Sequence, residues 1–187
     1  MTWLHLVRHG LPDIRRQLAA HEWTLSPDAQ QGLVALRNSG VLPAGAVWFS
    51  SPEPKAMETA RFLSDGVIVV RDGFREQVRS ARWLSDGDLR SAVRRAFEDP
   101  HQAALPGWEP LGRTRRRVTS AARLLIESLA PTAQVVATGH GTAWTILVSE
   151  LTDSPPDLEA WEQMLMPDHC AIDLDSRAVV ARWGSWT

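Results

Sequence analysis

The sequence predicts a three-layer α/β sandwich, in which a mostly parallel β-sheet is flanked by helices. Short apolar runs alternate along the chain with longer amphipathic stretches, which is typical of strands joined by helices in a parallel sheet. With 187 residues, of which 44% are hydrophobic, the chain suits one domain with one sizeable core. We therefore expect residues 1–187 to form a single domain, with an excursion at about 71–110 that covers a site.

Six apolar runs are short enough to be strands, and turn or cap signals bound them. The run at 67–70 is β-branched throughout, which favours a strand over a helix. We expect strands at 3–7, 47–49, 67–70 and 135–137, and two more at 170–174 and 179–183 around an Asp-Ser-Arg turn.

Helices are expected between these strands. The dipeptides 26–27 and 51–52 each place proline directly after a serine N-cap, which is a typical helix start. Apolar residues then recur at helical spacing. We expect helices at about 26–38, from 51 through 63, at 89–97, at 111–129 and from the 138–142 motif to about 151.

Composition and charge narrow the functional classes. The net charge of −2 gives no reason to expect nucleic acid or a membrane as a partner. The one cysteine, Cys170, excludes an intrachain disulfide and a multi-thiolate zinc site, and its apolar neighbours suggest a small filler in a strand. The first residues do not resemble a signal peptide, and no run approaches the roughly 18 apolar residues of a membrane span. We expect a cytoplasmic protein.

Three polar motifs stand where predicted strands end. Arg8-His9-Gly10, Ser50-Ser51-Pro52 and Gly139-His140-Gly141 each follow an apolar run directly. In open α/β sheets, ligands bind beyond the carboxyl ends of the strands. The three motifs are therefore expected to meet at one edge of the sheet and to form a site there.

The residue types in these motifs indicate a ligand that is an anion with several oxygens. Gly10 allows a sharp turn, so its carbonyl can hold one ring nitrogen of His9 and leave the other free to attack. Arg8 offers a planar fork for phosphate oxygens, and His140 precedes a helix whose amides can point at an anion. Lys55 can reach the same space from a helix start. We find no obvious carboxylate among these groups, which suits phosphoryl transfer.

Plainer interpretations compete with this one. His9 alone could be a structural histidine, and the partner motifs are what favour an active-site position. Lys55 could be a surface lysine, and Glu76 could form an ordinary surface ion pair with a neighbouring arginine. His5 and His9 share one strand face, but a metal site is not favoured because no carboxylate or cysteine pattern accompanies them. Other histidines, His169 among them, are expected at the surface or in loops.

Five motifs in order resemble the histidine phosphatase superfamily, which includes cofactor-dependent phosphoglycerate mutases and many small phosphatases. The resemblance covers most of the chain and implies a phosphoglycerate mutase-like fold. The motifs are Leu6-Val7-Arg8-His9-Gly10, the segment 49–60, Phe74-Arg75-Glu76, Pro106-Gly107-Trp108-Glu109 with Arg117, and the segment 135–141.

The resemblance also implies a role for each site residue. His9 is the nucleophile that forms a phosphohistidine, and Glu76 protonates the leaving group and later activates water. The phosphoryl oxygens are held by Arg8, Lys55 and His140. Substrate binding at the same rim is expected of Gly10, Ser51 and Gly141. The resemblance implies neither a metal nor a cofactor.

Lys55, the only lysine of the chain, stands where the family usually has arginine. Lysine keeps the charge but loses the bidentate fork, which predicts weaker phosphate binding or an altered substrate. Two functions stay open: a metal-independent phosphatase acting on a small phosphorylated metabolite, and a catalytically impaired, phosphate- or phosphoester-binding or regulatory member of the same fold. A phosphoprotein substrate also stays open. A mutase is less favoured because the chain is short for one. The sequence predicts no oligomeric state.

Overall fold

The computed structural model describes residues 2–80, 83–130 and 133–187 and contains a six-stranded sheet in the order β3-β2-β4-β1-β5-β6. The neighbours from β3 to β1 are parallel, whereas β5 pairs antiparallel with β1 and β6 pairs antiparallel with β5. The predicted mostly parallel sheet is therefore confirmed. Its strands are β1 (Trp3–Arg8), β2 (Val47–Ser50), β3 (Ile68–Val70), β4 (Val135–Gly139), β5 (Asp168–Asp173) and β6 (Ala178–Ala181).

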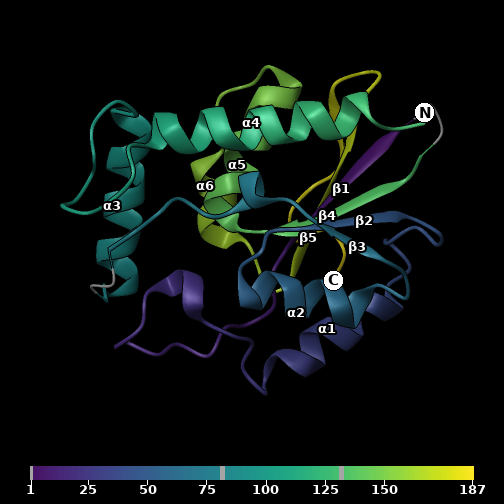
Figure 1. Ribbon diagram of the computed structural model, residues 1–187, viewed down its shortest axis with the longest axis horizontal. Helices are drawn as coiled ribbons and strands as arrows, with labels where there is room; N and C mark the ends of the chain where they lie inside the picture. Colours follow the sequence, from purple (N-terminus) through teal and green to yellow (C-terminus); the bar gives the residue numbers. More distant parts are fainter. Residues whose placement is uncertain (1, 81–82, 131–132) are drawn as a thin grey trace.

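Helices cover both faces of this sheet, so the three layers are also as predicted. Figure 1 shows α4 (Leu111–Glu127) and α5 (Gly141–Thr152) on one side of the sheet, and α1 (Ala29–Asn38) and α2 (Pro54–Leu63) on the other. The remaining helices are α3 (Asp86–Glu98) and α6 (Leu158–Gln163). The sequence pattern does not predict α6, because six residues are too few to show helical periodicity.

Alternate side chains of the central strands enter different cores. Leu4 and Leu6 of β1 pack into the core under α4 and α5, whereas Val7 packs into the core under α1 and α2. Burial on both faces is expected for a central strand of a parallel sheet. Trp144 of α5 lies against the end of β4, where its indole donates a hydrogen bond to the carbonyl of Val7 at 2.9 Å. A Cβ at Gly139 would lie 2.5 Å from this ring, so only glycine fits there.

The second predicted helix start is wrong by two residues. The helix begins at Pro54 with Glu53 as its N-cap, instead of at Pro52 with Ser51. Ser51 still belongs to the strand end, because its N–H donates to the carbonyl of Thr138 at 2.9 Å. Pro54 then occupies the first helical turn, where its missing N–H costs nothing. This shift turns Glu53 toward the end of the sheet.

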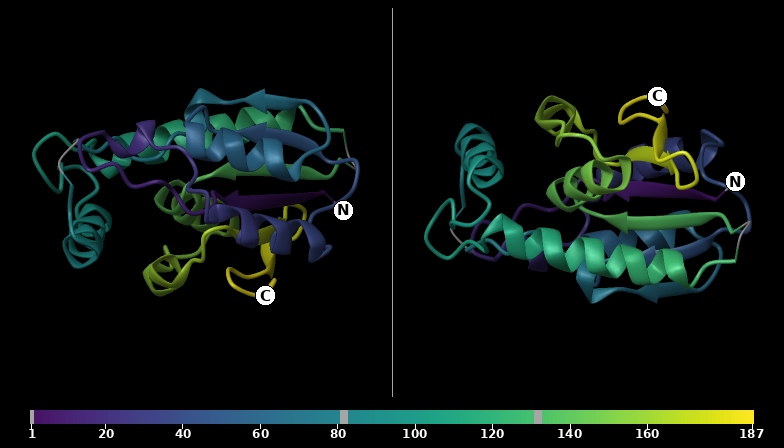
Figure 2. Two further views of the ribbon diagram at one scale, coloured as in Figure 1. Left: turned by 90° about the horizontal axis from the view of Figure 1, so that it is seen from below. Right: turned by 90° about the horizontal axis from the view of Figure 1, so that it is seen from above.

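Two segments extend beyond the carboxyl ends of the parallel strands. The loop after β1, purple in Figure 2, and the segment that carries α3 lie side by side at the end of the molecule opposite the N-terminus. The guanidinium of Arg16 in the loop lies 4.0 Å from the ring centroid of Trp83, just before α3. A cation–π contact therefore joins the two segments.

Two of the exclusions based on sequence can be compared with the structure. Cys170 lies buried in β5, and burial raises the pKa of its thiol to about 12, so it behaves as the predicted filler. Within the described ranges, none of the helices has the length and apolar character needed to cross a bilayer.

A pair of histidines is buried between β1 and β5. The prediction that His169 lies at the surface is wrong: it is 1% exposed, and its Nε2 lies 3.0 Å from Nδ1 of His5. One of these nitrogens must carry the proton and the other must accept it. Burial lowers the pKa of both rings, and the charge of His5 also contributes to lowering the pKa of His169 to about 4. The pair is therefore neutral at neutral pH.

This pair should make the protein less stable in acid. The unfolded His169 has an ordinary pKa of about 6.5, so between pH 6.5 and pH 4 the unfolded chain binds more protons than the folded one and stability falls as pH falls. We expect wild type to lose roughly 2–3 kcal/mol more free energy of unfolding than His169→Gln between pH 7 and pH 4.5, measured by urea denaturation. The matched control is His101→Gln, at an exposed histidine. Equal losses of free energy of unfolding in wild type and His169→Gln would contradict the lowered pKa of His169.

Candidate active site

The register of three parallel strands brings the polar motifs to one edge. Arg8 pairs with Gly139 across β1 and β4, and Ser50 pairs with Thr138 across β2 and β4. His9, Ser51 and His140 therefore follow at the same level. The rings of His9 and His140 lie 5.3 Å apart between centroids, in an edge-to-face arrangement. The predicted convergence of the three strand ends is confirmed.

A pocket of about 440 Å³ opens at this edge. Gly141, which lines it, opens α5 beside Arg8, and a Cβ there would lie 3.5 Å from Nε of Arg8 and 3.2 Å from Nε1 of Trp161. Gly10 and Ser51 are not among the residues that line the pocket; the structure places them behind His9 and His140. Six of the residues singled out in the sequence line it: Arg8, His9, Lys55, Glu76, His140 and Gly141.

His9 is held in the tautomer that a nucleophile requires. Its Nδ1 lies 2.8 Å from the carbonyl oxygen of Gly10, so Nδ1 carries the proton and Nε2 keeps a lone pair. The turn itself is fixed, because Gly10 N–H donates to Oγ1 of Thr59 at 3.0 Å. Burial, and after it the charge of Lys55, lower the pKa of His9 well below its usual range. The ring is therefore neutral and able to attack.

His140 is equally buried and is oriented by Ser51. Its Nε2 lies 2.8 Å from Oγ of Ser51 and 3.6 Å from a carboxylate oxygen of Glu53. Burial and the nearby Lys55 lower the pKa of His140 well below its usual range. Ser51 thus acts on the pocket through His140, which it holds in place.

Three buried nitrogens of pocket residues have no hydrogen-bond partner among the described residues. They are Nε of Arg8, Nε of Arg79 and Nδ1 of His140. Leaving buried polar groups unpaired costs free energy, so such groups cluster where a ligand supplies the missing partner. Two of them are guanidinium N–H donors, and the third becomes a donor in one tautomer. A set of this kind fits an oxyanion.

Lys55 is not a free cation, because a buried carboxylate holds it. Its ammonium donates to Oε2 of Glu53 at 2.8 Å and to the carbonyl of Ala20 at 2.6 Å, which leaves one of its three N–H donors available. Glu53 is 2% exposed and Lys55 is 5% exposed. The structure thus differs from the expectation that no carboxylate stands among these groups. A negative charge next to the lysine weakens the attraction of the pocket for an anion.

Glu76 lies across the N-terminus of α5. One carboxylate oxygen accepts from Ala143 N–H at 3.2 Å and from Gln77 N–H at 2.8 Å, and the other accepts from Thr142 N–H at 3.1 Å. It therefore satisfies amide donors that a helix start leaves unpaired. Two of the amides that the sequence suggested for an external anion, those of Thr142 and Ala143, are therefore occupied by a side chain of the protein. Glu76 remains part of the pocket lining.

Arg117 of α4 fixes the backbone that carries Glu76. Its guanidinium donates to the carbonyls of Gly73, Arg75 and Glu76 at 2.8–3.1 Å, and to Glu109 at 3.1 Å. Glu109 in turn accepts from Val78 N–H at 3.2 Å. The two residues therefore join the start of the excursion to the long helix, which makes the position of Glu76 well defined.

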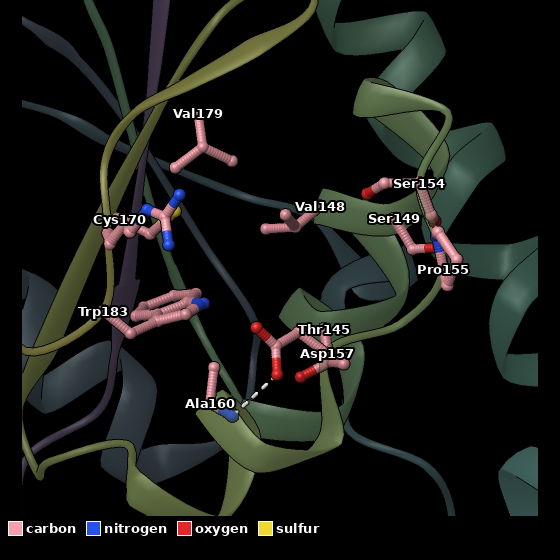
Figure 3. Close-up of a pocket in the computed structure, with 11 residues that line it drawn as sticks. Thr145, Val148, Ser149, Ser154, Pro155, Asp157, Ala160, Cys170, Val179 and Trp183 are labelled. Carbon is pink, nitrogen blue, oxygen red and sulfur yellow. Dashed lines mark hydrogen bonds between the residues drawn. The ribbon is translucent and has the colours of Figure 1, made fainter.

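A second pocket, of about 290 Å³, lies between α5, α6 and the strands β5 and β6 (Figure 3). Its lining includes Cys170, whose thiol is kept protonated by burial. The Asp157 side chain in this pocket caps α6 by accepting from Ala160 N–H at 2.9 Å. No histidine is among the described residues that line it. The pocket at the strand ends is thus the better candidate for chemistry.

Sequence reasoning missed Glu53 and gave Arg79 no role of its own. Glu53 stands between two prolines, and recognising Pro54 as the helix start would have placed it at the N-cap facing the site. Arg79 follows Glu76 by three residues, and its Nη2 lies 3.9 Å from the Glu76 carboxylate and 2.7 Å from Oγ1 of Thr142. The three-residue spacing between Glu76 and Arg79 can be read from the sequence. The position of Arg79 in the pocket, however, depends on the path of the excursion at about 71–110.

Comparison with known proteins agrees with this geometry. The profile of the family described as Histidine phosphatase superfamily (branch 1) matches residues 4–179. YhfR of Bacillus stearothermophilus superposes with a TM-score of 0.75 at 20% identity, over 99% of this chain and 97% of that one. A mycobacterial glucosyl-3-phosphoglycerate phosphatase solved with VO3 superposes with a TM-score of 0.72 at 22% identity, over 98% of each chain. The Rv3214 protein of Mycobacterium tuberculosis superposes with a TM-score of 0.73 at 18% sequence identity, over 100% of this chain and 99% of that one. The chain has no significant match among curated proteins.

Removing the Glu53 charge should strengthen oxyanion binding. In Glu53→Gln the one amide oxygen can still accept from Lys55, the hydrogen bond from Glu76 N–H at 2.9 Å is lost, and the pocket gains one unit of net positive charge. We expect the inhibition constant of inorganic phosphate to fall about 5- to 30-fold, as one charge at short range and intermediate dielectric predicts. Glu58→Gln, on the same helix but outside the pocket lining, is the matched control and should leave the constant unchanged. An unchanged constant in Glu53→Gln would show that the carboxylate does not face the anion.

Proposed function

The chain belongs to the histidine phosphatase superfamily, and from this premise we propose that it hydrolyses small phosphomonoesters through a phosphohistidine formed on His9. The observation that carries the proposal is the state of His9. Its Nδ1 is fixed on the Gly10 carbonyl, its ring is neutral, and it shares the pocket with buried guanidinium N–H groups that have no partner among the described residues. Superfamily membership supports phosphatase- or mutase-like chemistry in general. In the proposed reaction side-chain cations stabilise the phosphoryl charge without a metal ion or cofactor, and we expect it to take place in the cytoplasm.

In the first step, Nε2 of His9 attacks phosphorus. The bond between nitrogen and phosphorus forms as the bond from phosphorus to the leaving oxygen breaks. Arg8, the free donor of Lys55 and His140 stabilise charge on the phosphoryl oxygens. Glu76 donates a proton to the leaving oxygen, so the alcohol departs neutral.

In the second step, water regenerates the enzyme. Glu76, now ionised, takes a proton from a water molecule whose oxygen attacks phosphorus. The nitrogen–phosphorus bond breaks, inorganic phosphate leaves, and His9 returns to its neutral form. Splitting one displacement into two replaces a slow attack by water with two easier steps. The backbone contacts hold Glu76 in one place, and N–H donors on both carboxylate oxygens favour the ionised form that takes the proton in this step.

A second function is favoured by a specific observation, the Glu53–Lys55 pair. Because the lysine already holds a carboxylate at 2.8 Å, the pocket has less charge available to activate a phosphoryl group. A catalytically impaired protein that binds phosphate or phosphoesters and serves a regulatory role would tolerate this. Calorimetric binding of a phosphoester without any turnover would favour that function over hydrolysis.

Replacing the proposed nucleophile separates these functions. His9→Ala should abolish hydrolysis of p-nitrophenyl phosphate and the acid-labile phosphate that wild type carries after brief incubation with substrate. The loss should exceed 10³-fold, because all the chemistry passes through this nitrogen. Vanadate is a suitable inhibitor, since the mycobacterial structural neighbour was solved with VO3. His21→Ala, at an exposed histidine of the pocket lining, is the control and should keep the phosphoenzyme. Turnover that survives in His9→Ala would rule out the mechanism.

The role of Glu76 can be tested with leaving groups of different basicity. Glu76→Gln should slow hydrolysis of an alkyl phosphate by about 10²-fold or more, because general acid help is worth that much to a poor leaving group. p-Nitrophenolate leaves without a proton, so its release in the first step should suffer less than about tenfold in single-turnover kinetics. Glutamine keeps only one of the two capping oxygens, and the weakened helix cap would lower stability by about 1 kcal/mol or less, which thermal melting reports separately. Equal losses for both esters would show that Glu76 does not donate the proton.

A further inference from the structure

The wall of the active-site pocket differs in character from its floor. The floor holds buried charged and hydrogen-bonding groups, with His9 6% and His140 1% exposed. The outer wall is formed mainly by apolar side chains that are open to solvent. Ile14 is 53% exposed, Val78 is 51% exposed and Met166 is 37% exposed, and all three line the pocket. Large apolar side chains in such positions leave hydrophobic surface in contact with water, which is typical of a binding site.

These side chains come from segments that the fold holds in place. The loop that carries Ile14 is closed by backbone hydrogen bonds from Ser26 N–H to Leu11 O at 2.8 Å and from Asp13 N–H to Thr24 O at 2.9 Å. The backbone of Val78 is fixed by Glu109, as described above. The contact between Arg16 and Trp83 then joins the two segments. The apolar wall is therefore a built feature of the pocket.

Several polar groups of the wall are already engaged by other residues of the protein. The hydroxyl of Thr142 accepts from Arg79 at 2.7 Å, whereas His21 and Asp86 are exposed polar side chains of the lining. Gln77 is 3% exposed; its amide N–H donates to the Glu109 carbonyl at 2.8 Å, and its side-chain oxygen has no partner among the described residues. Arg75 is paired with Asp72 at 2.6 Å. A leaving group rich in hydroxyls would therefore regain only part of its hydrogen bonds to water and would gain nothing from the apolar side chains.

We propose that this pocket selects phosphomonoesters whose leaving group is a hydrocarbon chain or ring, with the phosphoryl group on the histidine floor and the apolar part against Ile14, Val78 and Met166. The inference rests on the proposed function for the placement of the phosphoryl group. The aromatic rings of Trp23 and Trp161, which also line the pocket, extend the apolar surface inward. A pocket of about 440 Å³ has room for both parts of such an ester.

The test is a series of n-alkyl phosphates with ethyl, butyl and hexyl groups, together with glycerol phosphate. The alkyl leaving groups have similar basicity, so differences in kcat/KM report contact with the wall. Full burial is worth about fourfold per methylene, so in this open pocket hexyl phosphate should exceed ethyl phosphate by at least about tenfold. Glycerol phosphate should react no faster than ethyl phosphate.

Variants locate the effect on the wall. Ile14→Ser and Val78→Ser should flatten the dependence of kcat/KM on chain length. Leu124→Ser, at a 63% exposed leucine near the C-terminal end of α4, removes a comparable side chain outside the pocket and should leave the slope as in wild type. A slope that survives both wall variants, or turnover that does not depend on chain length, would overturn the inference while leaving the phosphatase intact.

Binding measurements keep the two hypotheses apart. Titration calorimetry of His9→Ala with the same alkyl phosphates reports affinity without chemistry. If no ester is hydrolysed by wild type but affinity rises with chain length, the phosphatase proposal fails and the apolar preference stands. If affinity is equal along the series, the preference is refuted whatever the activity.

Discussion

The parallel register of β1, β4 and β2 is the constraint on which the site depends. Pairing Arg8 with Gly139 and Ser50 with Thr138 sets the ends of three strands at one level. A shift by one residue would turn the following side chains to the other face of the sheet, as the two-residue period of a strand requires. The two imidazoles could then not lie 5.3 Å apart. The cores on both faces fix this register, so the hydrophobic pattern of the strands and the geometry of the site have the same origin.

The charges at the strand ends are balanced more closely than a simple cationic pocket would be. The residues that line the pocket include four positively charged side chains, Arg8, Lys55, Arg75 and Arg79, and three negatively charged ones, Glu53, Glu76 and Asp86. Neutral His9 and His140 add hydrogen-bonding capacity without charge. Such a pocket still favours an anion, but it does so through a few directed N–H donors rather than through a strong overall field. Selectivity among esters then depends more on the leaving group, which is the part of the ester that would contact the apolar wall.

The sequence predicted the layers, the six strands and the convergence of the polar motifs, because these follow from hydrophobic periodicity and from residues adjacent to strand ends. It did not predict the burial of His169, since one polar residue in an apolar strand looks the same whether it is exposed or paired. It also missed the Glu53–Lys55 contact. That contact depends on where a helix begins, and two prolines two residues apart offered equivalent starts. Side-chain partners across the fold, such as Glu76 with the amides of α5, depend on the path of a long irregular segment that has no periodic signal.

The capping of α5 by Glu76 explains why the proposed phosphoryl contacts are side chains. A helix start that follows a strand offers free amides, and in many proteins those amides hold the phosphate. Here the carboxylate takes the amides of Thr142 and Ala143, so we expect the oxyanion to be met mainly by Arg8, Lys55 and His140. In return, Glu76 is held beside the pocket by the backbone rather than by flexible side chains. A group that is to donate a proton and then take one back needs this fixed position more than the substrate needs two additional amide donors.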